Sequence, residues 1–216
     1  MSFQLSQDEG TLLVQLARRA VENHLKTRKH SALPGGLGQK LLQPCGVFVT
    51  INTVRNKEKE LRGCIGYPYP TTPLAEAVVD SAINAATRDP RFPSLEPKEL
   101  DHIVFEVSVL TPPQKIEAKH PKEYCAKIKV GEDGLIIERG IYKGLLLPQV
   151  PVEWEWDEEE FLCQCCNKAG LPADYWLVQG TDVYKFQCLI AQEMTPNGKV
   201  EVINPSDLKN RKARQH

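Results

Sequence analysis

The sequence predicts an α+β fold, because helical and strand patterns occur together without the regular βαβ rhythm of a doubly wound sheet. Three segments carry this prediction: an amphipathic stretch at about 7–28 and alternating β-branched runs at 45–54 and 103–110. No internal repeat is visible, and 216 residues suffice for one large domain or two small lobes. We therefore expect a single module over residues 1–216, in which helices pack against a sheet.

The first helix has a strong start signal and a continuous apolar face. Ser6 can cap the helix, and Glu9 stands three residues later, as in a capping box. The apolar positions that follow at helical spacing are Leu12, Leu13, Leu16, Ala17, Ala20, Val21 and Leu25. A polar, glycine-rich connection then leads away from the helix.

Two extended segments follow this connection. The run CGVFVTINTV (45–54) alternates as a strand does. Its expected faces are Val47, Val49 and Ile51 on one side and Phe48 and Thr50 on the other. A polar loop or hairpin turn, RNKEKE, separates this strand from an extended piece that contains the sequence LRGCIG (61–66).

The remaining elements alternate in type along the chain. Thr72 before Pro73 is a good helix start, since threonine can cap and proline is tolerated at the first helical position. The prolines of RDPRFPSLEP then force an extended path. The later elements are, in order, a strand IVFEVSVL (103–110), a hairpin of GLIIE (134–138) and GLLLP (144–148), a helix capped by Asp157, a strand VYKFQCLIAQEM (183–194) and a frayed tail SDLKNRKARQH.

Charge and composition exclude several classes of protein. The formal net charge is −1, from 27 basic and 28 acidic residues, so no global field draws the chain to nucleic acid or to anionic lipid. No basic and apolar leader opens the sequence, and no run approaches the ~20 apolar residues of a membrane span. We expect a soluble, cytoplasmic protein without a membrane partner, for which the charge disfavours nucleic-acid binding and whose seven cysteines stay reduced.

The six residues LRGCIG place a cation next to a thiol. In an extended strand Arg62 and Cys64 would share one face, while Leu61 and Ile65 would hold the strand in the core. A guanidinium beside a sulfur favours the thiolate, which is the nucleophilic form of cysteine. The alternative is a packed strand with a buried cysteine, an outward arginine and glycines that serve a bulge.

Other residues are candidates for the same site. The glycines at 63 and 66 would let a ligand or another backbone approach closely. Glu106 lies in the middle of a strand, where a desolvated carboxylate could act as acid or base, unless that face meets water. Asp89 and Arg91 could form a charged corner, although a turn held by an aspartate explains Asp89-Pro90 equally well.

The cysteine cluster CQCC (163–166) does not indicate a metal site. On the helix that starts at Asp157, Cys165 and Cys166 fall on the apolar stripe and should face the core. A structural zinc site needs four ligands with a second spaced pair, and the histidines show no ligand spacing. We therefore predict no metal ligands, and the sequence names no cofactor.

Several motifs together resemble those of a known family. LRGCIG, DPRFPSL (89–95), GLLLPQV (144–150), WDEEEFL (156–162) and NKAGLP (167–172), with a downstream Trp176, are similar in sequence and order to the AMMECR protein family. The resemblance covers nearly the whole chain. It implies a stand-alone module of the archaeal and bacterial type, with two lobes, a mixed or largely antiparallel sheet flanked by helices, and a cleft near LRGCIG.

The resemblance supplies positions and no reaction. The positions that carry over are Arg62, Gly63, Cys64, Gly66, Asp89, Arg91, Phe92, Pro148 and Gln149. Prokaryotic members are often associated with Memo-like and radical-SAM-type proteins, which makes such proteins candidate partners. The boundary between the implied lobes cannot be placed from the sequence.

Two classes of function fit these residues. In the first, the chain is an enzyme in which Cys64 is the nucleophile or redox thiol, Arg62 holds an anion and Glu106 acts as acid or base. In the second, it is a non-catalytic binding or adaptor module, and the cleft receives a small molecule or a protein partner. An RNA-associated role is a third class, which the near-zero net charge argues against.

Overall fold

The computed structural model describes residues 4–29, 32–56 and 58–203, and these fall into two compact units. Unit 1 contains the chain up to Leu110 together with Leu189–Ile203, and unit 2 contains Thr111–Cys188. One strand, β7 (Asp182–Glu193), begins in unit 2 and ends in unit 1. The basic segment from 206 onward, expected to be a frayed tail, lies outside the described residues.

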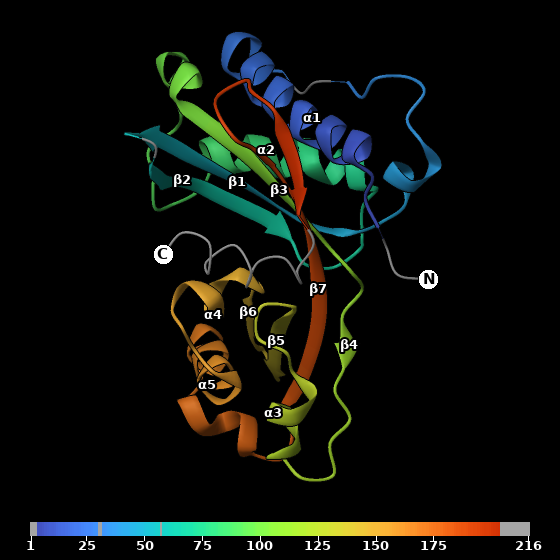
Figure 1. Cartoon of the computed structure of the whole chain (residues 1–216), viewed down its shortest axis with the longest axis vertical. Coiled ribbons are helices and arrows are strands. Elements are labelled where there is room, and N and C mark those ends of the chain that lie inside the picture. Colours follow the sequence, from blue (N-terminus) through green and yellow to red (C-terminus); the bar gives the residue numbers. More distant parts are fainter. Residues whose placement is uncertain (1–3, 30–31, 57, 204–216) are drawn as a thin grey trace. The chain divides into compact units, whose positions relative to one another are not determined.

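Unit 1 is a sheet with two helices on one face. The sheet order is β2-β1-β3-β7, and β8 pairs with β7. The helices α1 and α2 cover one side of this sheet (Figure 1). The elements are α1 (Gln7–Thr27), η1 (Gln39–Leu42), β1 (Gly46–Arg55), β2 (Glu58–Tyr67), α2 (Leu74–Thr87), η2 (Pro97–His102), β3 (Ile103–Leu110) and β8 (Val200–Ile203).

Local signals explain where the two helices of unit 1 begin. The expected capping box is present: the Ser6 hydroxyl accepts from the Glu9 amide at 3.1 Å, and the Glu9 carboxylate accepts from the Ser6 amide at 2.8 Å. The helix α2 begins one residue later than expected. Pro73 is its N-cap and no side chain caps it, so Thr72 does not have the predicted capping role.

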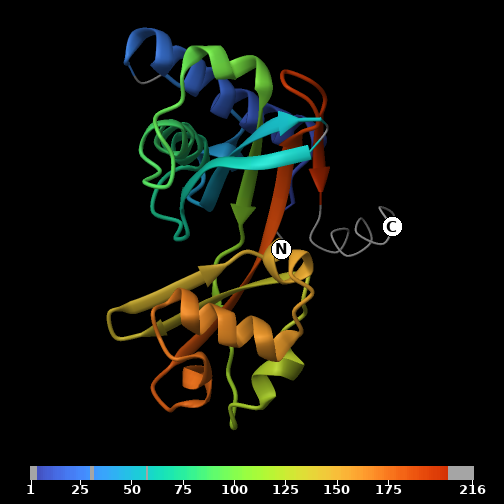
Figure 2. The same cartoon turned by 90° about the vertical axis from the view of Figure 1, so that its left-hand side faces the viewer.

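Unit 2 is a smaller sheet covered by a helix. Its strands are β4 (Gln114–Lys115), β5 (Asp133–Arg139), β6 (Tyr142–Leu146) and the first part of β7. The helix α5 (Glu158–Lys168) packs on the β5–β6 hairpin (Figure 2). Its expected cap is confirmed, since the Asp157 carboxylate accepts from the Glu160 amide at 2.8 Å. Three short helices, α3 (Glu123–Lys127), α4 (Gln149–Glu153) and η3 (Ala173–Leu177), complete the unit.

The α+β prediction is confirmed. The pairs β1–β2, β1–β3, β5–β6, β5–β7 and β7–β8 are all antiparallel, and helices flank the strands. The sequence patterns missed α3, α4, β4 and β8, because elements of two to five residues are too short to show a period. Within the described part of the chain, no helix is long and apolar enough to cross a membrane.

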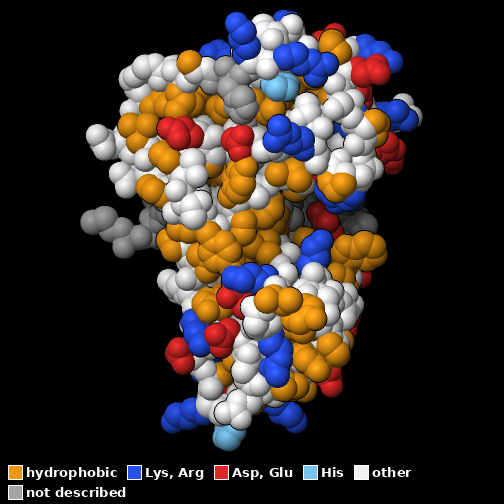
Figure 3. Space-filling view, turned by 180° about the vertical axis from the view of Figure 1, so that it is seen from behind, with side chains coloured by type: hydrophobic (Ala, Val, Ile, Leu, Met, Phe, Trp, Pro, Cys, Tyr) orange, Lys and Arg blue, Asp and Glu red, His pale blue; other side chains and the backbone are white. Residues whose placement is uncertain are grey.

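The surface has no region dominated by one sign of charge on the face seen in Figure 3. Lysine and arginine side chains are interspersed there with aspartate and glutamate (Figure 3). This mixture agrees with the formal net charge of −1. Long-range electrostatic steering of a polyanion to this face is therefore not expected.

Candidate functional site

The LRGCIG sequence lies on β2, an edge strand that pairs with β1, and a β-bulge interrupts it. Ile51 pairs with Gly63 and Asn52 pairs with Leu61, so Arg62 is the extra residue on β2. Because of the bulge, Leu61 does not anchor the strand as predicted, and it is 43% exposed. Ile65 does pack against the core of unit 1.

The two glycines of the motif are required by close backbone approaches within unit 1. A Cβ atom on Gly63 would overlap the carbonyl oxygen of Ala85 in α2. A Cβ atom on Gly66 would overlap the carbonyl oxygen of Val47 and the backbone of Phe48 in β1. The expected close approach at these glycines is therefore made by the protein's own backbone.

Cys64 belongs to a row of polar side chains that crosses three strands. Thr50 on β1 is the register partner of both Cys64 on β2 and Glu106 on β3. Directly opposed residues in antiparallel strands project on the same side of a sheet, so these three side chains are neighbours. The Thr50 hydroxyl donates a hydrogen bond to the Cys64 sulfur over 3.3 Å.

Asp89 ties this row to the segment that follows α2. The side chain of Asp89 is almost fully buried, and its Oδ2 accepts the backbone N–H of Cys64 at 2.8 Å. The same carboxylate accepts from Arg91 Nε at 3.0 Å and from Arg91 Nη2 at 2.7 Å. The bond from Arg91 holds the pKa of Asp89 at about 2, and the Cys64 amide adds to this effect. Asp89 is thus ionised throughout the neutral range.

The Cys64 thiol is neutral in this arrangement. Burial raises the pKa of the Cys64 thiol above its ordinary value, and the nearby charges of Glu106 and Asp89 raise it further. The hydrogen bond from Thr50 and the charge of Arg91 act in the opposite direction without reversing the shift. We expected Arg62 to be the cation that lowers the pKa of this thiol. The cation that acts on Cys64 is instead Arg91.

Arg62 has a separate set of partners. Its Nε and Nη2 atoms donate to the two carboxylate oxygens of Glu99 at 2.8 and 3.2 Å, and Nη1 donates to the carbonyl of Pro93 at 2.9 Å. Only 12% of the Arg62 side chain is exposed. Burial opposes the charged form of Glu99, but the bond from Arg62, the bond from the Glu96 amide and the charges of Arg62 and Lys98 together outweigh it and leave the pKa of Glu99 below its ordinary value.

A groove of about 770 Å³ opens beside this ion pair, entirely within unit 1. One wall comes from the ends of β1 and β2, including Val54 and Leu61, and the other from Phe92, Pro93 and η2. Both arginines lie near the Phe92 ring, whose centroid is 6.0 Å from Cζ of Arg62 and 5.4 Å from Cζ of Arg91. Leu61 and Arg62 of the motif line this groove, whereas Cys64 and Arg91 are not among its lining residues, so a cleft centred on Cys64 stays a prediction.

Gln149 lies apart from the other candidates along the chain. It opens α4 in unit 2, whereas the cysteine, the arginines and the carboxylates described above belong to unit 1. Its Oε1 atom is buried and accepts no hydrogen bond from any described residue. The predicted binding role of Gln149 stays a prediction.

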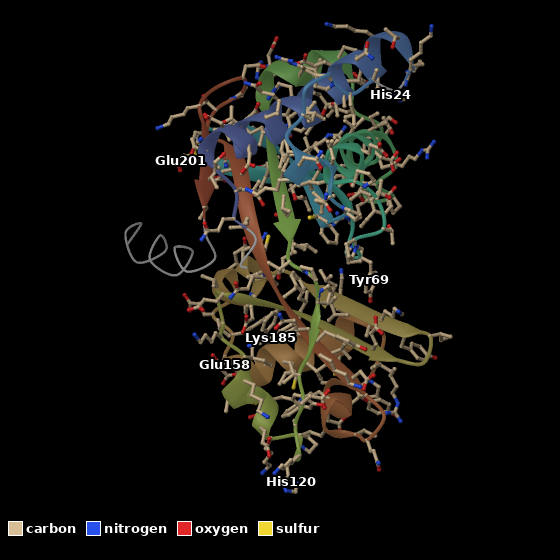
Figure 4. All side chains as sticks on the ribbon, turned by 90° about the vertical axis from the view of Figure 1, so that its right-hand side faces the viewer. His24, Tyr69, His120, Glu158, Lys185 and Glu201 are labelled. Carbon is tan, nitrogen blue, oxygen red and sulfur yellow. The ribbon has the colours of Figure 1, made fainter. Side chains whose placement is uncertain are left out.

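Within the described residues, the histidines and the clustered cysteines do not form a metal-binding group. His24 projects from α1 in unit 1 and His120 precedes α3 in unit 2 (Figure 4). Burial raises the pKa of Cys165 to about 12 and that of Cys166 to about 11, so both are neutral core side chains. Among the residues that the structure describes, no group of three or more histidine, cysteine or acidic side chains is placed to hold a metal ion.

Two residues of the site were missed by the sequence patterns. Thr50 gave only part of a signal, because continuing the pairing of Arg55 with Glu58 would set it opposite Gly63, and the bulge at Arg62 moves its partner to Cys64. Glu99 gave none, since it comes from a short 3₁₀ helix and meets Arg62 only in three dimensions.

Comparisons with known proteins show which family this chain resembles in sequence. A sequence model of the AMMECR1 family matches residues 14–191. Protein PH0010 of Pyrococcus horikoshii is 53% identical over 202 residues, which cover 93% of this chain and 98% of that protein. Protein MJ0810 of Methanocaldococcus jannaschii is 52% identical over 198 residues, which cover 91% of this chain and 96% of that protein.

A solved structure agrees with the sequence comparison. The crystal structure of PH0010, described as an uncharacterized protein, matches with a TM-score of 0.88 at 52% identity and covers 94% of this chain and 100% of that one. These relatives are stand-alone archaeal proteins, as the motifs implied. The chain belongs to the AMMECR1 family.

Proposed function

We propose that this chain is a binding module that holds the anionic group of a ligand beside Cys64, with Arg91 as the recognition residue and Cys64 as a neutral thiol. The observation that carries the proposal is the state of Arg91. Its side chain is 52% exposed, yet a buried carboxylate holds it in a fixed orientation. The ligand is a small molecule or a segment of a protein partner, with Memo-like and radical-SAM-type proteins as candidates by family association.

The arrangement of Arg91 suits the recognition of a carboxylate or a phosphate. A guanidinium has five N–H donors, and Asp89 accepts two of them, which leaves three for other partners. Because the pair with Asp89 already fixes the side chain, a ligand would not have to order it on binding. Planar anions are recognised best by such a pre-oriented guanidinium.

A cysteine-dependent enzyme is the second candidate. The observation that favours it is the row of Thr50, Cys64 and Glu106, which sets a carboxylate and a hydroxyl near a thiol on a rigid sheet. In this reading Cys64 is the nucleophile, Glu106 accepts its proton and Arg62 or Arg91 holds the substrate anion. The raised pKa of Cys64 counts against it, because a nucleophilic cysteine is normally held as the thiolate.

The Arg91 proposal predicts a site-specific response to anions. Titration of the ¹⁵N-labelled protein with inorganic phosphate should give saturable NMR shifts at the Arg91 Nε–H and at the Cys64 amide. Arg91→Gln should weaken binding by roughly tenfold or more, since it removes a charge-assisted pair of hydrogen bonds. Arg91→Lys should have an intermediate effect, because it keeps the charge and loses the planar fork.

Arg88→Gln is the matched control. Arg88 is an exposed arginine at the C-terminal end of α2, so its replacement changes the net charge by the same amount without touching Asp89. We expect this variant to bind phosphate as the parent does. Equal weakening by both variants, or no shift at Arg91 and Cys64 in the parent, would rule out Arg91 as the recognition residue.

Alkylation of Cys64 separates the two candidate functions. With iodoacetamide and peptide mapping by mass spectrometry, the rate at Cys64 should stay low near pH 7 and rise with a midpoint above about 8.5, the value of an unperturbed thiol. The direction follows from the raised pKa, which lowers the thiolate fraction at every pH below it. A midpoint below 8.5 would instead favour the cysteine-dependent enzyme.

A further inference from the structure

The groove beside the Arg62–Glu99 ion pair is larger than an anion site alone requires. Its volume of about 770 Å³ is in the range of sites that hold a drug-sized ligand, whereas a single carboxylate or phosphate group needs far less. Arg91 does not line the groove, but the next residue, Phe92, does. A ligand whose anionic group is held by Arg91 can therefore extend past Phe92 into the groove.

A second guanidinium in this groove is fixed in the same way as that of Arg91. Glu99 accepts two of the five N–H donors of Arg62 and the Pro93 carbonyl accepts a third, which leaves two for other partners. The Glu99 carboxylate is itself occupied, because it also accepts from the backbone amide of Glu96 at 2.8 Å. Arg62 is therefore pre-oriented for an anion, and binding would not have to order its side chain.

The distance between the two guanidiniums limits the spacing of the anionic groups. The centroid of the Phe92 ring lies 6.0 Å from Cζ of Arg62 and 5.4 Å from Cζ of Arg91, so the two Cζ atoms cannot be further apart than the sum of these distances. Residues i and i+2 of an extended peptide are about 7 Å apart and project on the same side, which is within that limit. Two acidic residues separated by one residue can therefore reach both cations.

An apolar side chain is exposed in the same groove. Leu61 is 43% exposed because of the bulge at Arg62, and bulges often re-aim a side chain next to a functional site. Val54, Phe92 and Pro93 complete the apolar part of the lining. An apolar centre within a polar rim is the usual anatomy of a surface that binds another protein.

The charged lining of the groove favours an acidic occupant. It has three cationic side chains, those of Arg55, Arg62 and Lys98, against two carboxylates, those of Glu60 and Glu99. One of these carboxylates is already paired with Arg62. Charge complementarity therefore selects an anionic ligand over a cationic one.

We propose that the ligand is an acidic peptide segment of a partner protein, in which one carboxylate binds Arg91, a second binds Arg62 and an apolar side chain lies against Leu61. The contact at Arg91 rests on the proposed function above. A peptide fits the groove better than a small dicarboxylate does, because only the peptide supplies both the second anion and the apolar contact.

Short capped peptides test this proposal on the full chain, with affinities measured by NMR titration of the ¹⁵N-labelled protein. Aspartate–leucine–aspartate should bind at least about tenfold more tightly than aspartate–leucine–asparagine, since it gains a second charge-assisted pair of hydrogen bonds. It should also bind more tightly than glutarate, a dicarboxylate without an apolar side chain, and its binding should weaken as salt is added.

Two variants locate the contacts. Arg62→Gln should abolish the preference for two acidic residues over one. Leu61→Ser should weaken binding of aspartate–leucine–aspartate roughly 3- to 10-fold and leave binding of aspartate–serine–aspartate unchanged. Leu42→Ser is the matched control, because Leu42 is 40% exposed in the same unit and does not line the groove. Leu61→Ser keeps the ion pair of Arg62 with Glu99, so it tests the proposal even if Arg62→Gln fails to fold.

The phosphate titration separates this proposal from the proposed function. Phosphate shifts at Arg91 should persist in both Arg62→Gln and Leu61→Ser. If they persist, three results would each overturn the peptide proposal alone: equal binding of the doubly and singly acidic peptides, tighter binding of glutarate, or equal binding by Leu61→Ser and the parent. Absence of a phosphate response at Arg91 in the parent would overturn both.

Discussion

Replacing Glu193 with alanine is expected to lower the free energy of unfolding by about 3–5 kcal/mol. The Glu193 carboxylate accepts from Arg18 Nε at 2.7 Å and Nη2 at 2.6 Å, and from the amide of Phe105 at 3.0 Å. Both charged side chains are at most 7% exposed. Without the carboxylate, a buried guanidinium loses its hydrogen-bonded counter-charge and keeps only the longer, more exposed pair with Glu22, and the Phe105 amide loses its acceptor. Urea unfolding followed by circular dichroism measures the loss.

Two comparisons test whether burial causes this effect. Lys40→Ala breaks the ion pair with Glu9, whose side chains are 38% and 28% exposed, and should cost at most about 1 kcal/mol. The double variant Arg18→Met with Glu193→Leu removes both charges and should recover much of the stability lost in Glu193→Ala. A Glu193→Ala variant no less stable than Lys40→Ala would contradict the assignment of a buried ion pair to this position.

Gly63→Ala is expected to destabilise the protein by roughly 3 kcal/mol, at the upper end of the range for overpacked sites. The added methyl would overlap the carbonyl oxygen of Ala85, which is backbone inside α2 and cannot rotate away. Relief requires β2 and α2 to separate, which weakens the packing between the sheet and the helix. The melting temperature should fall by several degrees, which differential scanning calorimetry would detect.

Gly38→Ala is the control for this substitution. Gly38 has a φ of −60° and no atom within 4 Å of where its Cβ would lie, so alanine fits there without strain. The variant should be as stable as the parent or slightly more so, because alanine reduces the entropy of the unfolded chain. Should Gly63→Ala melt together with Gly38→Ala, the close approach of α2 would not be the reason for glycine in the motif.

Regular elements of the fold were predictable because their signals are local. The capping box at Ser6 and the alternation of β1 and β3 depend on neighbouring residues alone, and both appear in the structure close to where they were expected. The glycines of the motif suggested a bulge as one alternative, but its position at Arg62 was not predictable, because a bulge is a mismatch between two strands and neither strand alone shows where it falls. The prediction for Leu61 failed for this reason.

The sequence predicted which residues lie in the candidate site better than it predicted which of them contact one another. Cys64, Asp89 and Arg91 were all named from the sequence, and they do lie together. The partners of the two arginines were not predicted. Arg62 binds Glu99, which comes from the 3₁₀ helix η2. Arg91 is the cation near the Cys64 thiol, a position that strand alternation had assigned to Arg62. Hydrogen bonds across the chain decide such pairings, and a single sequence does not contain them.

The path of β7 has a consequence for synthesis of the chain on the ribosome. Unit 2 is inserted between two parts of unit 1, so the sheet of unit 1 stays incomplete until Leu189–Ile203 has been made. Arg18 emerges early, together with the more exposed Glu22 of the same helix, but its buried partner Glu193 follows only when the end of β7 leaves the exit tunnel. The described part of unit 2, Thr111–Cys188, is therefore available to fold before the described part of unit 1 is complete, even though the nascent chain begins with unit 1.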